Sequence, residues 1–163
     1  MPSFDVVSQV DMQELDNVIN QVKKEIGQRF DFRGSKSSID LDKTKEVIKI
    51  NADDDMKLNA MHQILMTKMA KRDVDHRCLV KGDAKPGSMG VLAQSVQVKS
   101  GLDKDKAKKV TKCIKDMNIK VTTEIRDKEV RVTSKKIDSL QAVQAHLKSN
   151  IADFPVQFVN QRS

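Results

Sequence analysis

At 163 residues the chain is long enough for one large domain or two small ones, and 38% hydrophobic with 33% charged residues describe a globular but polar protein. Two widely separated cysteines, Cys78 and Cys113, exclude a disulfide framework and indicate a reducing compartment. No apolar run approaches the roughly 18 residues of a membrane span, and the N-terminus lacks a basic segment followed by an apolar stretch, so we expect a cytoplasmic protein outside the membrane.

The charge is unevenly distributed along the chain. The net charge is +7, and residues 1–90 carry 15 Lys and Arg against 15 Asp and Glu, whereas residues 91–163 carry 15 against 8. The whole positive surplus therefore lies in the second half of the sequence. Clustered cations attract phosphates over a Debye length of about 8 to 10 Å, so this asymmetry indicates an anionic partner.

Apolar residues that recur at three- and four-residue steps predict four helices. Asp11 is placed to cap the first helix and Gly27 to end it. The predicted helices are Met12–Ile26, Asp55–Lys71, Asp103–Met117 and a fourth built on Ile137, Leu140, Val143 and Leu147. Segments of period two predict the strands, which are Phe4–Gln9, Phe30–Phe32, Ser38–Leu41, Glu46–Asn51, Cys78–Val80, Val91–Lys99, Ile119–Arg126, Glu129–Thr133 and Val156–Val159.

The order of these elements predicts an α+β fold made of two similar units. The second half reads strand, helix, strand, strand, helix, strand, which is the ferredoxin-like βαββαβ order, with a tight turn at Asp127-Lys128. The first half offers the same order, and its Lys45-Glu46-Val47 is echoed by Lys128-Glu129-Val130. We therefore interpret the chain as a duplication in which residues 1–90 and 91–163 each form an antiparallel sheet with helices on one face.

Residue types that carry catalysis or bind metals do not occur at recognisable spacings. The Gly, Pro and Lys content of Lys81–Gly90 predicts a mobile loop between the two units. This loop has two glycines at P-loop spacing but lacks the Lys-Ser/Thr pair, and a strand follows it instead of a helix. His76 and Cys78 lack a second pair at zinc spacing. The run Asp53–Asp55 is explained by the start of a helix, where acidic residues favour the positive end of the helix dipole. We expect no catalytic residue, no metal and no cofactor, and hence a protein that is not an enzyme.

The third predicted helix carries the sharpest signal for phosphate binding. Lys104, Lys108, Lys112 and Lys115 follow at steps of four, four and three, so they form one stripe away from the apolar face. Only three acidic residues lie nearby, Asp103, Asp105 and Asp116, and this balance suits contacts with phosphates, but a solvated helix face is an equally good explanation of the stripe.

The sheet of the second unit is predicted to present a polar face opposite its helices. Alternation places Lys120, Arg126 and Arg131 on that face, mixed with Glu124 and Glu129. RNA-recognition sheets stack bases on exposed aromatic side chains, whereas this chain has no Trp, no Tyr and five Phe. We therefore expect recognition of phosphates or backbone on this sheet, and not stacking of bases.

The segment Phe30-Asp31-Phe32-Arg33-Gly34 has two interpretations. On a strand both Phe side chains share one face, and two core Phe residues are the favoured interpretation. In the alternative, the Phe residues form a stacking platform and Arg33 binds a phosphate.

Several segments together resemble a known family over essentially the whole chain. They are Met1–Asp5, Arg29–Gly34, Lys108–Asp116, Ile119–Val121, Val130–Thr133 with Lys135 and Lys136, Leu140–Val143 and Gln157-Phe158. On these residues the chain resembles the YajQ family of bacterial nucleotide-binding proteins. It departs from the family at Ser134, where glycine is usual, and at Gln161, where phenylalanine is common. The resemblance implies two ferredoxin-like units that exchange their N-terminal strands, so that strand 4–9 joins the second sheet and strand 91–99 the first.

The resemblance also implies binding of a nucleotide or RNA without an established enzymatic reaction. We expect a monomer that binds phosphates through its basic second unit, and the alternative is a protein-interaction or regulatory module whose basic face is only solvated. The choice between mononucleotide, signalling dinucleotide and RNA stays open. The expected binding residues are cationic: Arg33, Lys104, Lys108, Lys112, Lys115, Lys120, Arg126, Arg131, Lys135 and Lys136.

Overall fold

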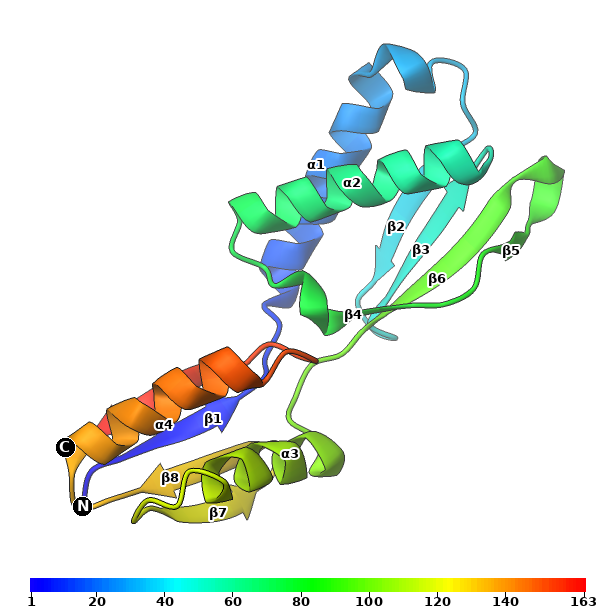
Figure 1. Cartoon of the computed structure of the whole chain (residues 1–163). Coiled ribbons are helices and arrows are strands. Elements are labelled where there is room, and N and C mark those ends of the chain that lie inside the picture. The colour runs from blue at the N-terminus through cyan, green and yellow to red at the C-terminus, as the bar shows by residue number, and fades with distance from the viewer. The chain divides into compact units, whose positions relative to one another are not determined.

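The computed structural model describes residues 1–163 and divides the chain into two units (Figure 1). Residues Val10–Lys99 form one unit, which we call the inserted unit. Residues Met1–Gln9 and Ser100–Ser163 together form the other, which we call the split unit because the inserted unit interrupts its sequence. No helix in either unit is long and apolar enough to cross a membrane.

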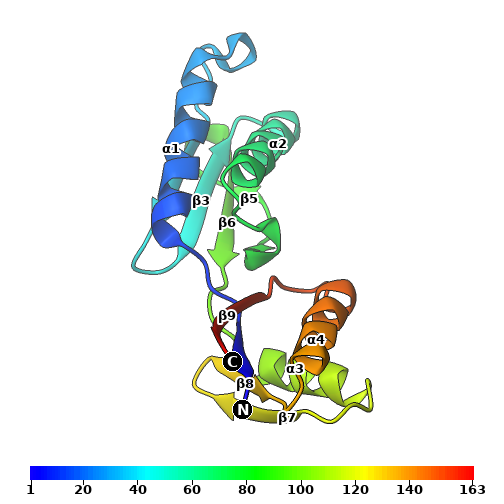
Figure 2. The ribbon, with the colours of Figure 1, turned by 90° about the vertical axis from the view of Figure 1, so that its left-hand side faces the viewer.

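The inserted unit packs two helices on one face of an antiparallel sheet (Figure 2). Its sheet has the order β2-β3-β6-β4, and the short β5 also pairs with β6. Isoleucines and valines of the sheet, such as Ile48, Ile50 and Val96, pack against Leu15 and Leu65 of the helices. The elements are α1 (Met12–Gln28), the 3-10 turn η1 (Phe30–Phe32), β2 (Ser38–Asp42), β3 (Val47–Ala52), α2 (Asp55–Lys71), η2 (His76–Cys78), β4 (Leu79–Lys81), β5 (Lys85–Pro86), η3 (Ser88–Gly90) and β6 (Leu92–Val98).

The split unit repeats this architecture around a second core. Its sheet has the order β7-β8-β1-β9, with every neighbouring pair antiparallel. Phe4 and Val6 of the sheet pack with Val110 and Leu147 of the two helices. The elements are β1 (Ser3–Val7), α3 (Lys104–Lys115), β7 (Thr122–Arg126), β8 (Glu129–Thr133), α4 (Ile137–Asn150) and β9 (Gln157–Arg162).

The prediction of two ferredoxin-like α+β units is confirmed by these two sheets. In each sheet a hairpin, β2-β3 or β7-β8, lies on one side of a central strand, and one more strand lies on the other. The central strand is β6 in the inserted unit and β1 in the split unit, where β1 lies beside β8 although residues 10–99 separate it from the rest of its sheet in sequence (Figure 1).

The segment Phe30–Phe32 differs from its prediction as a strand with two core Phe side chains. Helix α1 continues through Gly27 to Gln28, and Phe30–Phe32 then forms a 3-10 turn. In a turn of three residues successive side chains do not alternate between two faces. Phe32 is therefore buried, whereas Phe30 is 81% exposed.

The loop predicted at Lys81–Gly90 is more ordered than its Gly, Pro and Lys content suggested. It lies within the inserted unit and does not link the two units. Lys85 and Pro86 pair with β6, and the backbone N–H of Gly82 donates to the carbonyl oxygen of Ser95 at 2.9 Å. Backbone pairing with β6 therefore overrides the turn-forming composition of the segment.

A buried carboxylate connects three strands of the split unit. Asp5 of β1 is 1% exposed, and its Oδ1 accepts from Arg131 Nε of β8 at 2.9 Å. Its Oδ2 accepts from Asn160 Nδ2 of β9 at 2.9 Å. The hydrogen bond from Arg131 holds the pKa of Asp5 below its ordinary value, against the opposing effect of burial. The charged form of Asp5 therefore stabilises the sheet.

A fragment of residues 10–99 is expected to fold alone, because it contains every strand of its sheet and the helices that cover them. Fragments 1–90 and 91–163 are expected to remain unfolded, since the first lacks β6 and the second lacks β1. Urea denaturation followed by circular dichroism is the measurement. A cooperative transition in fragment 1–90 would show that β6 is dispensable to the inserted unit.

Replacing Asp5→Asn should lower the free energy of unfolding by about 2 kcal/mol at neutral pH, because Arg131 loses its charged partner. The folded-state pKa of Asp5 lies below the unfolded-state value, so the stability it contributes is present at neutral pH and lost as the pH falls through the folded-state pKa. The difference between variant and parent should therefore shrink below about pH 4. The exposed Asp127→Asn is the control and should stay within about 0.5 kcal/mol at both pH values.

Candidate nucleotide-binding site

Helix α3 separates an apolar face from a row of lysines. Asp103 caps its N-terminus by accepting from the backbone N–H of Lys106 at 2.9 Å, and Ala107, Val110 and Ile114 are buried against the sheet. The opposite side carries four exposed lysines, which we call the lysine face: Lys104, Lys108, Lys112 and Lys115. None of the four is in an ion pair.

Helix electrostatics explain only part of the lysine face. Lys112 and Lys115 lie in the last turn of α3, where cations favour the negative end of the helix dipole. Lys104 is the first residue of the helix, where a cation faces the positive end of the dipole and is unfavourable. Lys104 and Lys108 thus repel each other and have no ion-pair partner to offset this repulsion. A bound anion would offset it.

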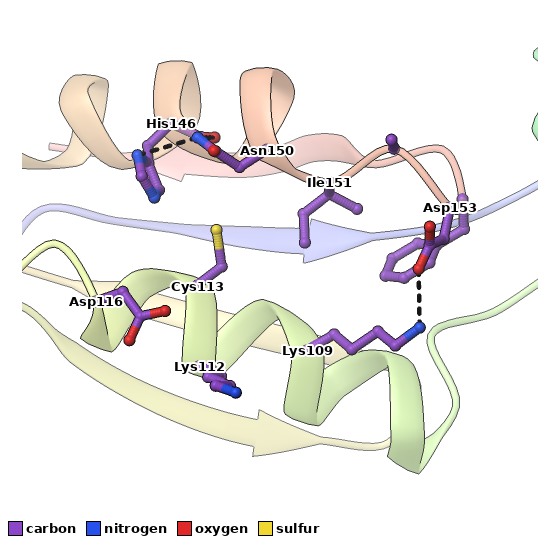
Figure 3. A pocket seen from close by; sticks show the side chains of 10 residues that line it. Lys109, Lys112, Cys113, Asp116, His146, Asn150, Ile151 and Asp153 are labelled. Atoms are coloured by element: carbon purple, nitrogen blue, oxygen red, sulfur yellow. Dashed lines mark hydrogen bonds and ion pairs between the residues drawn. The ribbon is translucent and has the colours of Figure 1, made fainter.

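A cavity of about 470 Å³ lies beside the lysine face, between α3, α4 and the turn that follows α4 (Figure 3). Of the lysine face only Lys112 lines it. The turns of α3 and α4 that face each other supply the remaining side chains, together with the segment after α4. The lining residues are Lys109, Lys112, Cys113, Asp116, His146, Asn150, Ile151, Ala152, Asp153 and Phe154.

An ion pair lies at one end of this cavity. Lys109 Nζ is 2.9 Å from Asp153 Oδ2, and both side chains are more than half exposed (Figure 3). The hydrogen bond raises the pKa of Lys109 and lowers the pKa of Asp153, so both stay charged at neutral pH. Exposed ion pairs contribute little stability, because water competes with them and salt screens them. Lys109 is therefore free to exchange its carboxylate partner for a phosphate.

The rest of the cavity combines an apolar floor with amide and imidazole groups. Ile151 and Phe154 are buried, and Cys113 is partly buried beside them. Asn150 Nδ2 donates to the carbonyl oxygen of His146 at 2.8 Å and lies 3.2 Å from Nδ1 of the same residue. Because the amide nitrogen is a donor, Nδ1 acts as the acceptor and the neutral ring carries its proton on Nε2. The cavity thus offers an apolar surface and hydrogen-bonding groups close to two lysines, as a nucleoside monophosphate requires.

The other expected binding residues lie in three separate places. Lys120, Lys135 and Lys136 are exposed around the turn that leads into α4, where the Ser134 hydroxyl donates to the carbonyl oxygen of Lys120 and accepts from the backbone N–H of Lys136, each at 3.2 Å. These three lysines form a second basic cluster in the split unit.

The two arginines of the sheet that were expected to bind phosphate, Arg126 and Arg131, have carboxylate partners. Arg131 binds the buried Asp5, and Arg126 Nη2 lies 3.2 Å from Glu124 Oε2 on the same strand. The register places Arg131, Glu124 and Asp5 side by side on the face away from the helices, as the alternation predicted. Arg33 lies in the inserted unit, with its guanidinium carbon 5.5 Å from the centre of the Phe30 ring. The ten expected residues therefore do not form one site.

The cavity residues His146, Asn150 and Asp153 had no signal of their own in the sequence. His146 and Asn150 are four residues apart and thus share one face of α4, but their partner surface is set by the packing of α4 against α3. Only the packing of α3 against α4 brings Cys113 and Lys109 of α3 next to that face of α4.

Comparison with known proteins identifies relatives over the full length of the chain. The model of the family described as nucleotide-binding protein YajQ-like matches residues 2–162. A nucleotide-binding protein of Oleidesulfovibrio alaskensis is 47% identical over 163 residues, and one of Geobacter sp. (strain M21) is 48% identical over 163 residues, with 100% of both chains covered in each case. A nucleotide-binding protein of Cytophaga hutchinsonii is 44% identical over 162 residues, which cover 99% of this chain and 100% of the relative.

Alkylation of Cys113 tests the environment of the cavity. Burial, and secondarily the negative charge of Asp116, raise the pKa of its thiol, so the reactive thiolate is scarce at about pH 7. We expect iodoacetamide to modify Cys113 more slowly than a cysteine in the urea-unfolded chain, with a rate that climbs as the pH rises. A Cys78→Ser variant isolates Cys113 as the reacting thiol. Equal rates in the folded and unfolded chain at neutral pH would contradict the raised pKa.

Proposed function

Because the chain belongs to the YajQ-like family of nucleotide-binding proteins, we propose that it binds the phosphates of a nucleotide or of RNA through the lysine face of α3. The observation that carries this proposal is a row of four exposed lysines without ion pairs, next to a cavity of about 470 Å³. The split unit that holds both features has 14 Lys and Arg against 9 Asp and Glu, so its overall charge attracts an anion.

The length of the lysine face favours a ligand with several phosphates. From Lys104 to Lys115 the helix rises by about 16 Å, whereas one phosphate group contacts two lysines at most one turn apart. RNA carries regularly spaced charges along its backbone and can neutralise the whole row, releasing counterions as it binds. A single-stranded segment of RNA is therefore the ligand that matches the row best, and a signalling dinucleotide matches part of it.

The cavity supplies the place for one base and ribose of that ligand. A phosphate between Lys109 and Lys112 would bring its nucleoside against Cys113 and Ile151, with His146 and Asn150 at hydrogen-bonding positions on the rim. The groups in the cavity are suited to binding and not to nucleophilic chemistry, because the raised pKa of Cys113 keeps its thiol protonated at neutral pH. We therefore propose a binding function without catalysis.

A protein-interaction module is the second candidate, and the edge of the same sheet favours it. Strand β7 is an edge strand, and its Ile125 is 51% exposed. An exposed edge can accept a strand from a partner protein by backbone pairing. Such binding would depend little on salt, whereas binding of an RNA backbone must weaken steeply as salt rises.

Replacing Lys108, Lys112 and Lys115 together by Gln should weaken binding of single-stranded RNA at least tenfold and reduce the salt dependence of log K by about two, since each lost phosphate contact removes about 0.7 from the slope. Fluorescence anisotropy of a labelled RNA at two salt concentrations measures both quantities. Stability should change by no more than about 0.5 kcal/mol, because the three positions are exposed and Gln keeps similar helix propensity.

The matched control replaces Lys24, Lys45 and Lys71 of the inserted unit by Gln. These lysines are also exposed and outside ion pairs, so the control removes the same total charge from elsewhere. It should bind RNA nearly as the parent does. Equal affinity and equal salt slope in both triple variants and the parent would leave the lysine face as a solvated surface and favour the protein-interaction candidate.

A further inference from the structure

An exposed aromatic side chain lies directly after α1 in the inserted unit, whereas the lysine face belongs to the split unit. Phe30 is 81% exposed, whereas Phe4 and Phe32 are 1% and 4% exposed. An exposed Phe costs solvation free energy unless a partner covers it, although a single such residue is common on protein surfaces. The surroundings of Phe30 therefore decide whether it is a binding residue.

The turn that carries Phe30 is held by its neighbours on both sides. Arg29 donates to both carboxylate oxygens of Asp31, at 3.0 and 2.9 Å, and its guanidinium lies 5.6 Å from the centre of the Phe32 ring. Lys57 of α2 lies 4.9 Å from the centre of that ring, and its Nζ also donates to the carbonyl oxygen of Asp31. Phe32 is thus the buried anchor that presents Phe30 outward.

The chain after the turn is fixed as well. Asp53 accepts from the hydroxyl of Ser35 and, at 3.0 Å, from the backbone N–H of Lys36. The hydrogen bond from Ser35 lowers the pKa of Asp53, so its carboxylate stays charged. Gly34 has a φ of +70°, a conformation that side chains disfavour, and this lets the chain reverse direction directly after Arg33. Because these contacts hold the backbone on both sides of Phe30, this segment loses little conformational entropy when Phe30 binds a flat ligand.

Arg33 places a positive charge beside the Phe30 ring, which favours an aromatic ligand that carries a negative charge. Its guanidinium carbon lies 5.5 Å from the centre of the Phe30 ring, and it has no carboxylate partner. Lys36, three residues on, is likewise exposed and outside ion pairs. The acids around them are already engaged, Asp31 by Arg29 and Asp53 by Ser35 and the Lys36 amide. Lys36 Nζ donates to the carbonyl oxygen of Met89 at 3.5 Å, so Arg33 is the cation that accompanies the ring. An aromatic ring beside an exposed guanidinium complements a flat ring that carries a phosphate.

A cavity of about 450 Å³ adjoins Arg33. Its lining includes Phe32, the backbone of Gly27 and Gly34, and the three serines Ser35, Ser37 and Ser38. It also includes Lys23 and Asp40, which pair with each other at 2.9 Å. Glycine backbone permits close approach of a ligand, and hydroxyls can both donate to and accept from the sugar and base edges of a nucleoside.

We infer that Phe30 and Arg33 form a second binding site, which stacks an unpaired nucleobase on the Phe30 ring and binds the attached phosphate through Arg33. Aromatic and guanidinium planes are the groups on which proteins stack unpaired bases. The site belongs to the inserted unit and uses none of the residues of α3 or α4. Because stacking involves an uncharged ring, binding here should depend less on salt than binding to the lysine face.

A Phe30→Trp variant of the full chain tests this site directly. The chain contains no Trp and no Tyr, so the introduced indole is the only strong fluorophore, and it preserves a stacking surface at this position. We expect saturable quenching of its emission by an oligoadenylate of about ten nucleotides, a length within the range that one single-strand-binding domain covers. Val80→Trp places the indole on the half-exposed Val80 of β4 as a matched control, and its emission should stay unchanged.

Adenosine monophosphate and the oligoadenylate distinguish the two sources of such a base. Equal quenching by both identifies a free nucleotide as a sufficient ligand, whereas quenching by the oligoadenylate alone identifies single-stranded RNA, and each result supports the site. In the Phe30→Trp background, Arg33→Gln should weaken the quenching several-fold. Unchanged emission with both ligands, together with unchanged oligoadenylate affinity in a Phe30→Ala variant, would overturn the inference.

The lysine-face variant separates this site from the proposed function. When Lys108, Lys112 and Lys115 are replaced by Gln in the Phe30→Trp background, quenching by adenosine monophosphate should persist with its affinity unchanged within about twofold, because those lysines belong to the other unit. Quenching by the oligoadenylate should still reach the same maximum, at a higher concentration. Loss of that quenching would show that the indole reports on the lysine face, and would likewise overturn a separate site at Phe30.

Discussion

The position of β1 between β8 and β9 is the constraint on which the split unit depends. The four-stranded sheet is complete only when Ser3–Val7 pairs with strands that follow the whole inserted unit in sequence. Phe4 and Val6 contribute the apolar side of this contact, and Asp5 contributes the polar side by binding both Arg131 and Asn160. A charge as buried as that of Asp5 is tolerated because both of its oxygens are hydrogen-bonded, and moving β1 by one residue would place Asp5 in the apolar core. The ion pair between Asp5 and Arg131 thus specifies the register of the central strand β1 as well as stabilising the sheet.

That sheet in turn determines where the candidate ligand-binding side chains of the protein lie. Helices α3 and α4 pack side by side on its apolar face, and their outward sides carry the lysine face and the rim of the cavity. The same amphipathic spacing that buries Ala107, Val110 and Ile114 directs Lys108 and Lys115 to solvent. Folding and the proposed phosphate binding therefore depend on opposite sides of one helix, so exposed lysines can be exchanged without disturbing the core.

The two proposed surfaces use different physical interactions. In our proposals the lysine face would attract the phosphate backbone through charge, and its binding would be sensitive to salt, whereas Phe30 would offer a ring for stacking beside the single guanidinium of Arg33. Backbone contacts supply affinity without sequence preference, and contacts with bases can supply preference. A chain that presents one surface of each kind is suited to single-stranded RNA, in which both backbone and bases are accessible.

The amino-acid sequence by itself determined the element types, the ferredoxin-like order and the direction in which the lysines of α3 point, because local periodicity sets which side chains share a face. It also indicated the family, through segments distributed over the whole chain. The prediction of a strand with two core Phe residues was confirmed for the burial of Phe32 and wrong for Phe30, since two residues with one intervening position share a face only on a strand, and the local fold here is a 3-10 turn. Only the tertiary structure decided that Arg131 is bound by Asp5, that Arg33 lies over Phe30, and that Lys109 and Cys113 line one cavity with His146 and Asn150. The Asp5–Arg131 pair and the cavity join residues far apart in the chain, and the contact of Arg33 with Phe30 depends on the conformation of a short turn. No periodicity within a single element encodes either kind of grouping.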